Sequence, residues 1–135
     1  MYLIACVDDR MGMMFNHRRV SQDKVVSKEI MDMCKNHSIY MQEYSAPLFS
    51  NGNVCNIKIV NELPFRELIG QYVFVENPAV IEESFIEKII LYRWNRKYPA
   101  DQYFPIDLNG WILSETKEFS GNSHEKITKE IFVRK

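Results

Sequence analysis

Arginine and aromatic side chains cluster in the stretch ILYRWNRKYPAD, residues 90–101. Four of them fall close together: Arg93, Trp94, Arg96 and Tyr98. Arginine binds acidic groups through its planar set of N–H donors, and it stacks on aromatic rings. Arg93 and Trp94 are adjacent, so on a strand they would face opposite sides and one of them would face a cleft. The stretch predicts a site for an acidic or aromatic ligand or, alternatively, a core tryptophan with arginines paired to nearby acids.

A second polar cluster lies in VDDRMGMMFNHRRVSQD, residues 7–23. Its Arg18 and Arg19, together with His17, could join the same ligand site. The alternative is that both arginines are simply solvated, as is usual in a loop. The stretch ends at Asp23, where a helical pattern begins. It is therefore either the mouth of a binding site or only the route from one element to the next.

Several kinds of catalysis have no signature in this chain. The histidines, His17, His37 and His124, are far apart, and none belongs to an HxH or HExxH pattern, so we expect no metal site. There is no GxSxG motif, and Cys34 precedes His37 only at the expected end of a helix. No catalytic residue can be assigned from these patterns.

Charge and cysteine usage narrow the partners and the compartment. Lys and Arg total 17 against 18 Asp and Glu, which gives no electrostatic case for nucleic acid or an anionic membrane. The first apolar run, YLIACV, stops at Asp8, too early for a signal peptide or a membrane span. Cys6, Cys34 and Cys55 are widely spaced with no CxxC pair, which predicts reduced thiols in a cytoplasmic protein.

The elements that must position these side chains begin with a strand, a helix and a second strand. Residues 2–7 are continuously apolar, which is typical of a strand buried on both faces. Apolar residues then recur at helical spacing up to Cys34. Ser21 is the predicted N-cap, with Asp23 in the first turn, where the helix dipole favours an acid. A strand at 38–41 completes a right-handed parallel crossover.

The rest of the chain changes from alternating elements to long strands. Its middle predicts strands at 57–60, 72–75 and 88–94, a short helix at about 78–85 capped by Asn77, and a surface connection at 44–53. The end predicts an antiparallel hairpin of 110–119 with 125–134. The fold class is therefore α/β: a single domain over 1–135 with a mixed, mostly parallel central sheet, flanking helices and a C-terminal antiparallel hairpin.

Three short motifs follow one another in a recognisable order. Val7-Asp8 with Gly12 comes first, DQYFP at 101–105 comes second, and Trp111 before a long hairpin ending in EIFVRK comes third. Together they resemble the dihydrofolate reductase-like family in a short and divergent form. The resemblance implies the dihydrofolate reductase fold.

The resemblance also implies a binding role for Asp23. Family members hold a pterin-like substrate with a carboxylate at the start of the first long helix, and Asp23 lies at the matching place. A partly buried acid can accept two hydrogen bonds from an amidine-like ring edge. The alternative is that Asp23 only stabilises the helix. The flanking FNHRRVSQD favours that alternative, because the family usually carries an apolar residue and a tryptophan there.

The residues that the family uses for NADPH are absent from the matching positions. The family has a Gly-Arg-x-Thr type segment where this chain reads SIYMQEYSAP, residues 38–47. It also has two glycines where a later strand meets a helix, so that bare amides reach the pyrophosphate. This chain has Glu76 and Asn77 there. A carboxylate repels a phosphate by about 1–4 kcal/mol per charge pair at ~4 Å, so we expect no cofactor.

Two functions follow from these observations. The first is a cytoplasmic small-molecule or protein-binding module with a reductase-like fold, no cofactor and no metal. Its candidate cleft residues are Asp23, Arg93, Trp94, Arg18 and Arg19. The alternative is a divergent NADPH-dependent reductase acting on a pterin-like or flavin-like ring. The first function favours a protein without enzymatic activity but leaves chemistry without NADPH open, and the alternative implies an oxidoreductase. The sequence specifies neither the ligand nor a protein partner.

Overall fold

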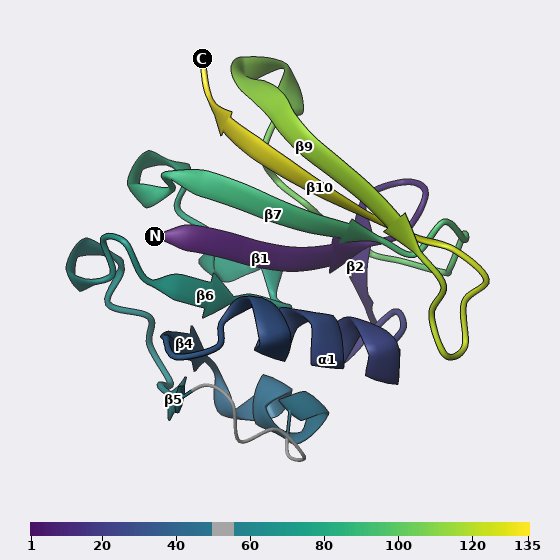
Figure 1. Ribbon diagram of the computed structural model, residues 1–135, viewed down its shortest axis with the longest axis horizontal. Coiled ribbons are helices and arrows are strands. Elements are labelled where there is room, and N and C mark those ends of the chain that lie inside the picture. Colours follow the sequence, from purple (N-terminus) through teal and green to yellow (C-terminus); the bar gives the residue numbers. More distant parts are fainter. Residues whose placement is uncertain (50–55) are drawn as a thin grey trace.

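The computed structural model describes residues 1–49 and 56–135. Within these ranges the chain forms a central sheet of seven strands and a second, smaller sheet beside it (Figure 1). The strand order of the central sheet is β5-β4-β6-β1-β7-β10-β9. The strands have these bounds: β1 Tyr2–Val7, β4 Ser38–Met41, β5 Asn56–Ile59, β6 Tyr72–Phe74, β7 Lys88–Arg93, β9 Trp111–Phe119 and β10 Ile127–Arg134.

The direction of pairing changes once across this sheet. The strands from β5 to β7 run parallel to their neighbours, whereas β10 is antiparallel to both β7 and β9. A bulge shifts the β9–β10 register between Ile131 and Phe132. The predicted class, an α/β fold with a mixed, mostly parallel sheet and a C-terminal antiparallel hairpin, is confirmed.

β1 occupies the middle of the sheet because its apolar residues serve both faces. Leu3 and Ile4 are both fully buried, and successive side chains on a strand point to opposite faces. Leu3 belongs to the same core cluster as Met13 of the second sheet, while Ile4 packs with Val26 and Ile30 of the helix. The sheet therefore separates two apolar cores.

The helix α1 (Lys24–Met33) begins later than predicted, with Asp23 rather than Ser21 as its N-cap. Asp23 is extended (φ −155°, ψ 128°), and its carboxylate accepts a hydrogen bond from the Val25 N–H. The Ser21 hydroxyl lies instead against Tyr98 and His124. Serine and aspartate are comparable caps, so these long-range contacts decide which of them is used.

The stretch between β1 and α1 contains a hairpin rather than a continuous loop. β2 (Gly12–Phe15) pairs antiparallel with β3 (Arg18–Arg19) on one side and with β8 (Gln102–Tyr103) on the other. Asn16 and His17 form the two-residue turn, with φ of 50° and 63°. Positive φ at both positions is what a type I′ turn requires. Arg19 is thereby placed on a strand.

Short 3-10 turns replace the second predicted helix. Residues 78–85 form two turns, η3 (Pro78–Val80) and η4 (Glu83–Phe85), because Ile81 returns to extended backbone between them. Asn77 caps η3 as predicted. None of the helices in the described ranges is both long and apolar enough to cross a membrane.

Three more 3-10 turns connect the strands: η1 (Glu43–Phe49), η2 (Phe65–Glu67) and η5 (Leu108–Gly110). The predicted surface connection at 44–53 is therefore structured over its first part. Its remaining residues, 50–53, and Cys55 lie outside the described ranges.

Candidate functional site

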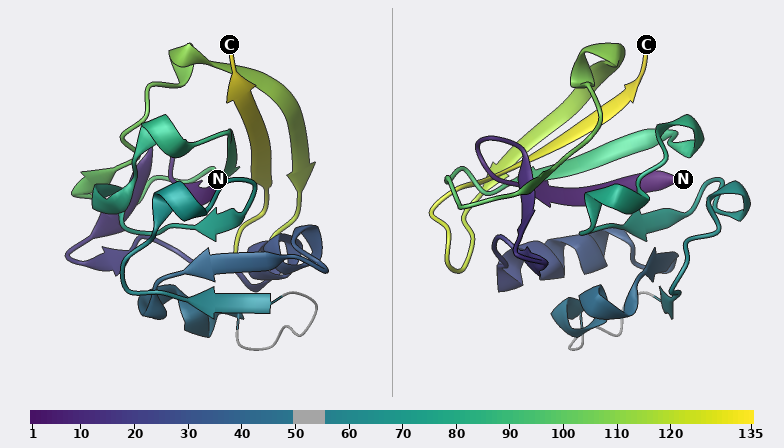
Figure 2. Two further views of the ribbon diagram at one scale, coloured as in Figure 1. Left: turned by 90° about the vertical axis from the view of Figure 1, so that its left-hand side faces the viewer. Right: turned by 180° about the vertical axis from the view of Figure 1, so that it is seen from behind.

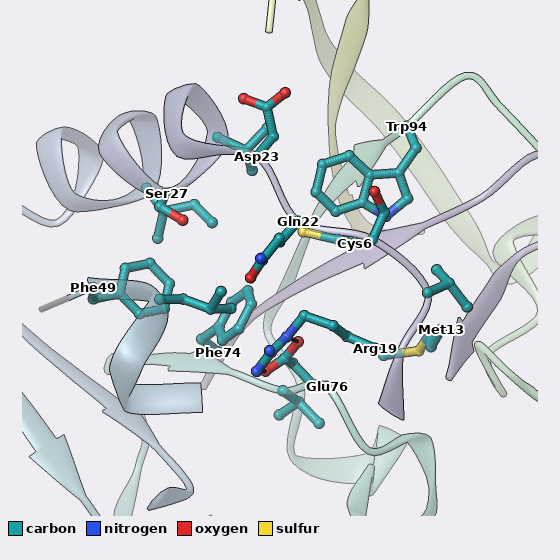
Figure 3. A pocket seen from close by; sticks show the side chains of 16 residues that line it. Cys6, Met13, Arg19, Gln22, Asp23, Ser27, Phe49, Phe74, Glu76 and Trp94 are labelled. Carbon is teal, nitrogen blue, oxygen red and sulfur yellow. Dashed lines mark hydrogen bonds and ion pairs between the residues drawn. The ribbon is translucent and has the colours of Figure 1, made fainter. Parts of the chain in front are cut away.

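A small cavity lies where the second sheet, α1, η1 and the ends of β1 and β6 meet (Figure 3). Its volume is about 20 Å³, which is room for about one water molecule. The side chains that give it chemical character are Cys6, Arg19, Gln22, Phe49, Phe74, Glu76 and Trp94. Gln22 points into the middle of this group, between Trp94 and Phe74 (Figure 3). In this conformation the site is too small for an organic ligand.

One wall of the cavity is an ion pair between Arg19 of β3 and Glu76, which follows β6. Arg19 Nε donates to Glu76 Oε2 at 2.7 Å, and Arg19 Nη2 donates to Oε1 at 3.0 Å. The Ser45 hydroxyl donates to Oε1 at 2.8 Å. The guanidinium also lies over the ring of Tyr44, 4.3 Å from its centroid. The carboxylate of Glu76 is thus fully engaged by neighbouring side chains.

Asp23 adjoins the cavity, but its carboxylate points away from it (Figure 3). Oδ1 accepts from the N–H groups of Val25 and Asn122, each at 2.9 Å. Oδ2 accepts from the Ser123 N–H at 2.8 Å and contacts His124 Nδ1 at 2.9 Å. A carboxylate only accepts, so Nδ1 carries the hydrogen. We call this set, Asp23 with Asn122, Ser123 and His124, the hairpin latch, because it ties the β9–β10 connection to the start of α1.

The hairpin latch controls the titration of Asp23. Burial by itself would raise the pKa of this carboxyl group. The hydrogen bonds from the Asn122 amide, the His124 ring and the Ser123 and Val25 amides outweigh burial, and they hold the pKa well below its usual range. Asp23 is therefore a stable carboxylate whose partners are supplied by the chain itself.

The far side of the His124 ring continues the polar network. Nε2 lies 2.8 Å from the Tyr98 hydroxyl and 3.1 Å from Ser21 Oγ, and the ring stacks on Trp94. Asp23, His124 and Ser21 thus have the connectivity of a nucleophile relay. However, the Tyr98 hydroxyl shares the same ring nitrogen at a shorter distance than Ser21 Oγ. We interpret the network as a structural support for Trp94.

Cys6 is not an activated nucleophile either. Loss of water around the thiol, and the Glu76 carboxylate nearby, raise the pKa of Cys6 far above its ordinary value. The thiol is therefore protonated near neutral pH. Within the described ranges, no group of three or more His, Cys, Asp or Glu side chains is arranged to hold a metal ion.

The motif Val-Asp with a following glycine locks the turn after β1. Asp8 is buried, and its Oδ1 accepts from the N–H groups of Gly12 at 2.7 Å and Arg10 at 2.9 Å. Its Oδ2 accepts from the Tyr98 N–H at 3.0 Å. A Cβ at Gly12 would lie 2.6 Å from Ala100 Cβ and 2.9 Å from Asp8 Oδ1. Only glycine fits there. Asp8 and Gly12 therefore both have a structural role in this turn.

The structure brings together three of the five candidate cleft residues. Arg19, Asp23 and Trp94 line the cavity. Arg93 instead pairs with Glu130 of β10, and it is not among the lining residues. Arg18 is exposed on β3. Arg93 and Trp94 were expected to face opposite sides, and of the two it is Trp94 that lines the cavity.

Sequence reasoning missed the residues whose partners are distant along the chain. His124 meets Asp23 across 101 positions, and Phe49 meets Phe74 edge to face at 5.1 Å from another turn. Nothing in the local pattern announces either contact. The sequence does show a glycine, Gly121, in the connection between the two last strands. The structure explains it, because a Cβ at this position would lie 2.5 Å from Asp23 Oδ2.

No family model matches this chain, and no curated protein matches it. Among solved structures, the fold is similar to dihydrofolate reductase from Enterococcus faecalis complexed with NADP(H) and RAB-propyl. The TM-score is 0.69 at 11% sequence identity, and the match covers 98% of this chain and 95% of that chain. The chain is thus a divergent protein with the dihydrofolate reductase fold, as its three short motifs predicted.

The strand end at Glu76 and Asn77 can be tested for its fit to a dinucleotide. Asn77 Oδ1 already accepts from the Ala79 N–H at 3.0 Å, and η3 is only three residues long. Arg19 and Ser45 hold the Glu76 carboxylate in front of this turn. These residues fit an internal ion pair and a self-capped turn. They do not fit a pyrophosphate, which needs open amides and no acid.

Proposed function

We propose that this chain is a small-molecule-binding module that keeps the dihydrofolate reductase fold without using NADPH. The observation that carries the proposal is the bidentate Arg19–Glu76 ion pair, reinforced by Ser45, at the strand end where the family places bare backbone. The side chains of Arg19 and Glu76 are only 22% and 10% exposed. A phosphate would have to separate them and leave a buried acid unpaired, which is strongly unfavourable.

The lining of the cavity suggests the class of ligand. Trp94, Phe49 and Phe74 offer aromatic surface, and the Gln22 amide offers both a donor and an acceptor. A flat heterocycle with a polar edge, of the pterin or flavin kind, matches that combination. Because the cavity has room for only about one water, such a ligand must displace lining side chains, Gln22 among them. Binding is thus expected to be accompanied by a conformational change.

The experiment has two arms. In the first, NADPH is titrated into the protein while nicotinamide fluorescence is followed, with the E. faecalis dihydrofolate reductase as the positive control. We expect no saturable change at micromolar cofactor. Micromolar binding would overturn the proposal in favour of a divergent NADPH-dependent reductase acting on a pterin-like or flavin-like ring, which the similarity to an enzyme solved with NADP(H) makes the second candidate.

The second arm tests the ligand class through tryptophan fluorescence. The chain has two tryptophans, so Trp111→Phe leaves Trp94 as the only reporter. We expect pterin and flavin heterocycles to quench this signal saturably. Replacement of Arg19 should weaken binding, and the exposed Arg18→Ala should not. Absence of quenching by every heterocycle would refute the proposed ligand class.

A further inference from the structure

β9 forms an outer edge of the central sheet. Its neighbour in the strand order is β10, and its other side faces outward (Figures 1 and 2). Every residue of β9 from 112 to 118 is exposed, including the apolar Ile112 and Leu113, which are 47% and 48% exposed. A long edge with unpaired backbone groups is a template for another strand. β9 therefore has the geometry to pair with an eighth strand from outside the molecule.

The charges of β9 make this edge complementary to itself. If two β9 strands pair antiparallel about a two-fold axis at Thr116, Glu115 of each copy lies directly opposite Lys117 of the other. Both side chains fall on the same face of the sheet, since they are two residues apart. Two opposite-charge pairs form at once, each of a kind that stabilises a sheet. The β9–β10 register shifts between Glu115 and Leu113, so the regular ladder around Thr116 does not extend to Leu113.

The same charges exclude the neighbouring registers. An axis at Glu115 would place that acid opposite itself, and an axis at Lys117 would place two lysines together. Like charges directly opposite are destabilising. The charges around Thr116 thus favour the register with the axis at Thr116 over the two neighbouring registers.

These charges are also available for pairing. Lys117 Nζ is 4.0 Å from Glu29 Oε1, at the limit of an ion pair, and Glu29 already binds Lys129 at 3.0 Å. Glu115 forms no ion pair within the described ranges. None of the residues that line the cavity belongs to β9, so pairing would leave the cavity unobstructed.

We propose that two copies of this chain associate through β9, antiparallel about Thr116, to form one continuous sheet. Light scattering coupled to size-exclusion chromatography should give twice the monomer mass of 16.0 kDa. Glu115→Lys and Lys117→Glu should each weaken dimerisation about tenfold or more, since both attractive pairs become repulsive. The double variant Glu115→Lys/Lys117→Glu should dimerise like the original chain, because the pairs are only reversed.

Mixing the two single variants gives a sharper test. A Glu115→Lys copy carries two lysines and a Lys117→Glu copy carries two acids, so the mixture should form a heterodimer although neither variant dimerises well alone. Lys28→Glu, on the exposed face of α1, makes the same charge change away from β9 and should leave the mass unchanged. A monomeric original chain at high micromolar concentration, or a dimer that tolerates both single variants, would overturn the proposal. Neither result bears on ligand binding in the cavity.

Discussion

Asp23 is the residue whose two possible roles the structure separates most clearly. The resemblance to reductases implied a carboxylate for a ligand, and the local pattern implied a helix stabiliser. In the structure, Oδ1 accepts from the N–H groups of Val25 and Asn122, and Oδ2 accepts from the Ser123 N–H and hydroxyl and from the His124 ring. A ligand would have to replace these donors before it could use the acid.

Asp23→Asn should therefore destabilise the protein. Asparagine can still cap the helix, but its NH₂ group would face the Ser123 N–H, and a buried donor left unsatisfied costs about 1–3 kcal/mol. Urea denaturation should show a loss of that size in the free energy of unfolding. Asp32→Asn, on an exposed part of the same helix, should change it by less than about 0.5 kcal/mol. Unchanged stability with loss of heterocycle binding would instead establish the ligand role.

At the scale of the residue, the sequence predicted which side chains lie near the site better than it predicted which side chains they contact. It put Arg19, Asp23 and Trp94 among the candidate side chains, and all three line the cavity. It could not distinguish Arg19 from Arg18, because the type I′ turn at Asn16 and His17 decides which arginine faces Glu76. Adjacent arginines in a sequence are alike until a strand assigns them to opposite faces.

At the scale of the element, the hairpin latch connects α1 with the β9–β10 hairpin. Gly121 lies in the connection between the two strands, and its N–H donates to the carbonyl of His124 at 2.9 Å. The backbone must approach Asp23 so closely at this point that no side chain fits. The position of the hairpin thus depends on one glycine and one carboxylate.

Gly121→Ala should loosen the latch. Its Cβ would lie 2.5 Å from Asp23 Oδ2 and 2.9 Å from the His124 carbonyl oxygen, and such overpacking costs about 1–3 kcal/mol. We expect lower stability and faster hydrogen exchange at the amides of Asn122 and Ser123. Gly110→Ala, where a Cβ meets nothing within 4 Å, is the matched control. Equal effects of the two substitutions would argue against the latch.

The elements were predictable where a local pattern was sufficient. The apolar run of β1, the strand at Ser38–Met41 and the C-terminal hairpin follow from periodicity, and the structure has them. The predicted start of α1 was wrong by two residues, because Ser21 and Asp23 are equivalent caps until the contacts of the hairpin latch favour Asp23. The prediction of a helix at 78–85 was wrong, and the structure has two 3-10 turns there. So short a helix is only marginally stable by itself.

At the scale of the whole molecule, acid should weaken the fold through Asp23. Its pKa in the folded protein lies below the unfolded value of about 3.9. The unfolded chain therefore binds this proton first as the pH falls, so the stabilisation is fully present above about pH 4 and is lost toward the lower folded pKa. Denaturation midpoints should decline below pH 4. Asp23→Asn should decline less steeply over the same interval, and parallel curves would refute this assignment.

The central place of β1 has a consequence for how the chain is made. Its partners on the two sides, beginning with Tyr72 and Lys88 opposite Tyr2, lie far along the chain. While a ribosome synthesises the protein, a strand that is apolar on both faces must wait for both neighbours to appear. Folding dominated by such distant pairings is slow. β1 therefore stays without both of its partner strands until β7 has been synthesised.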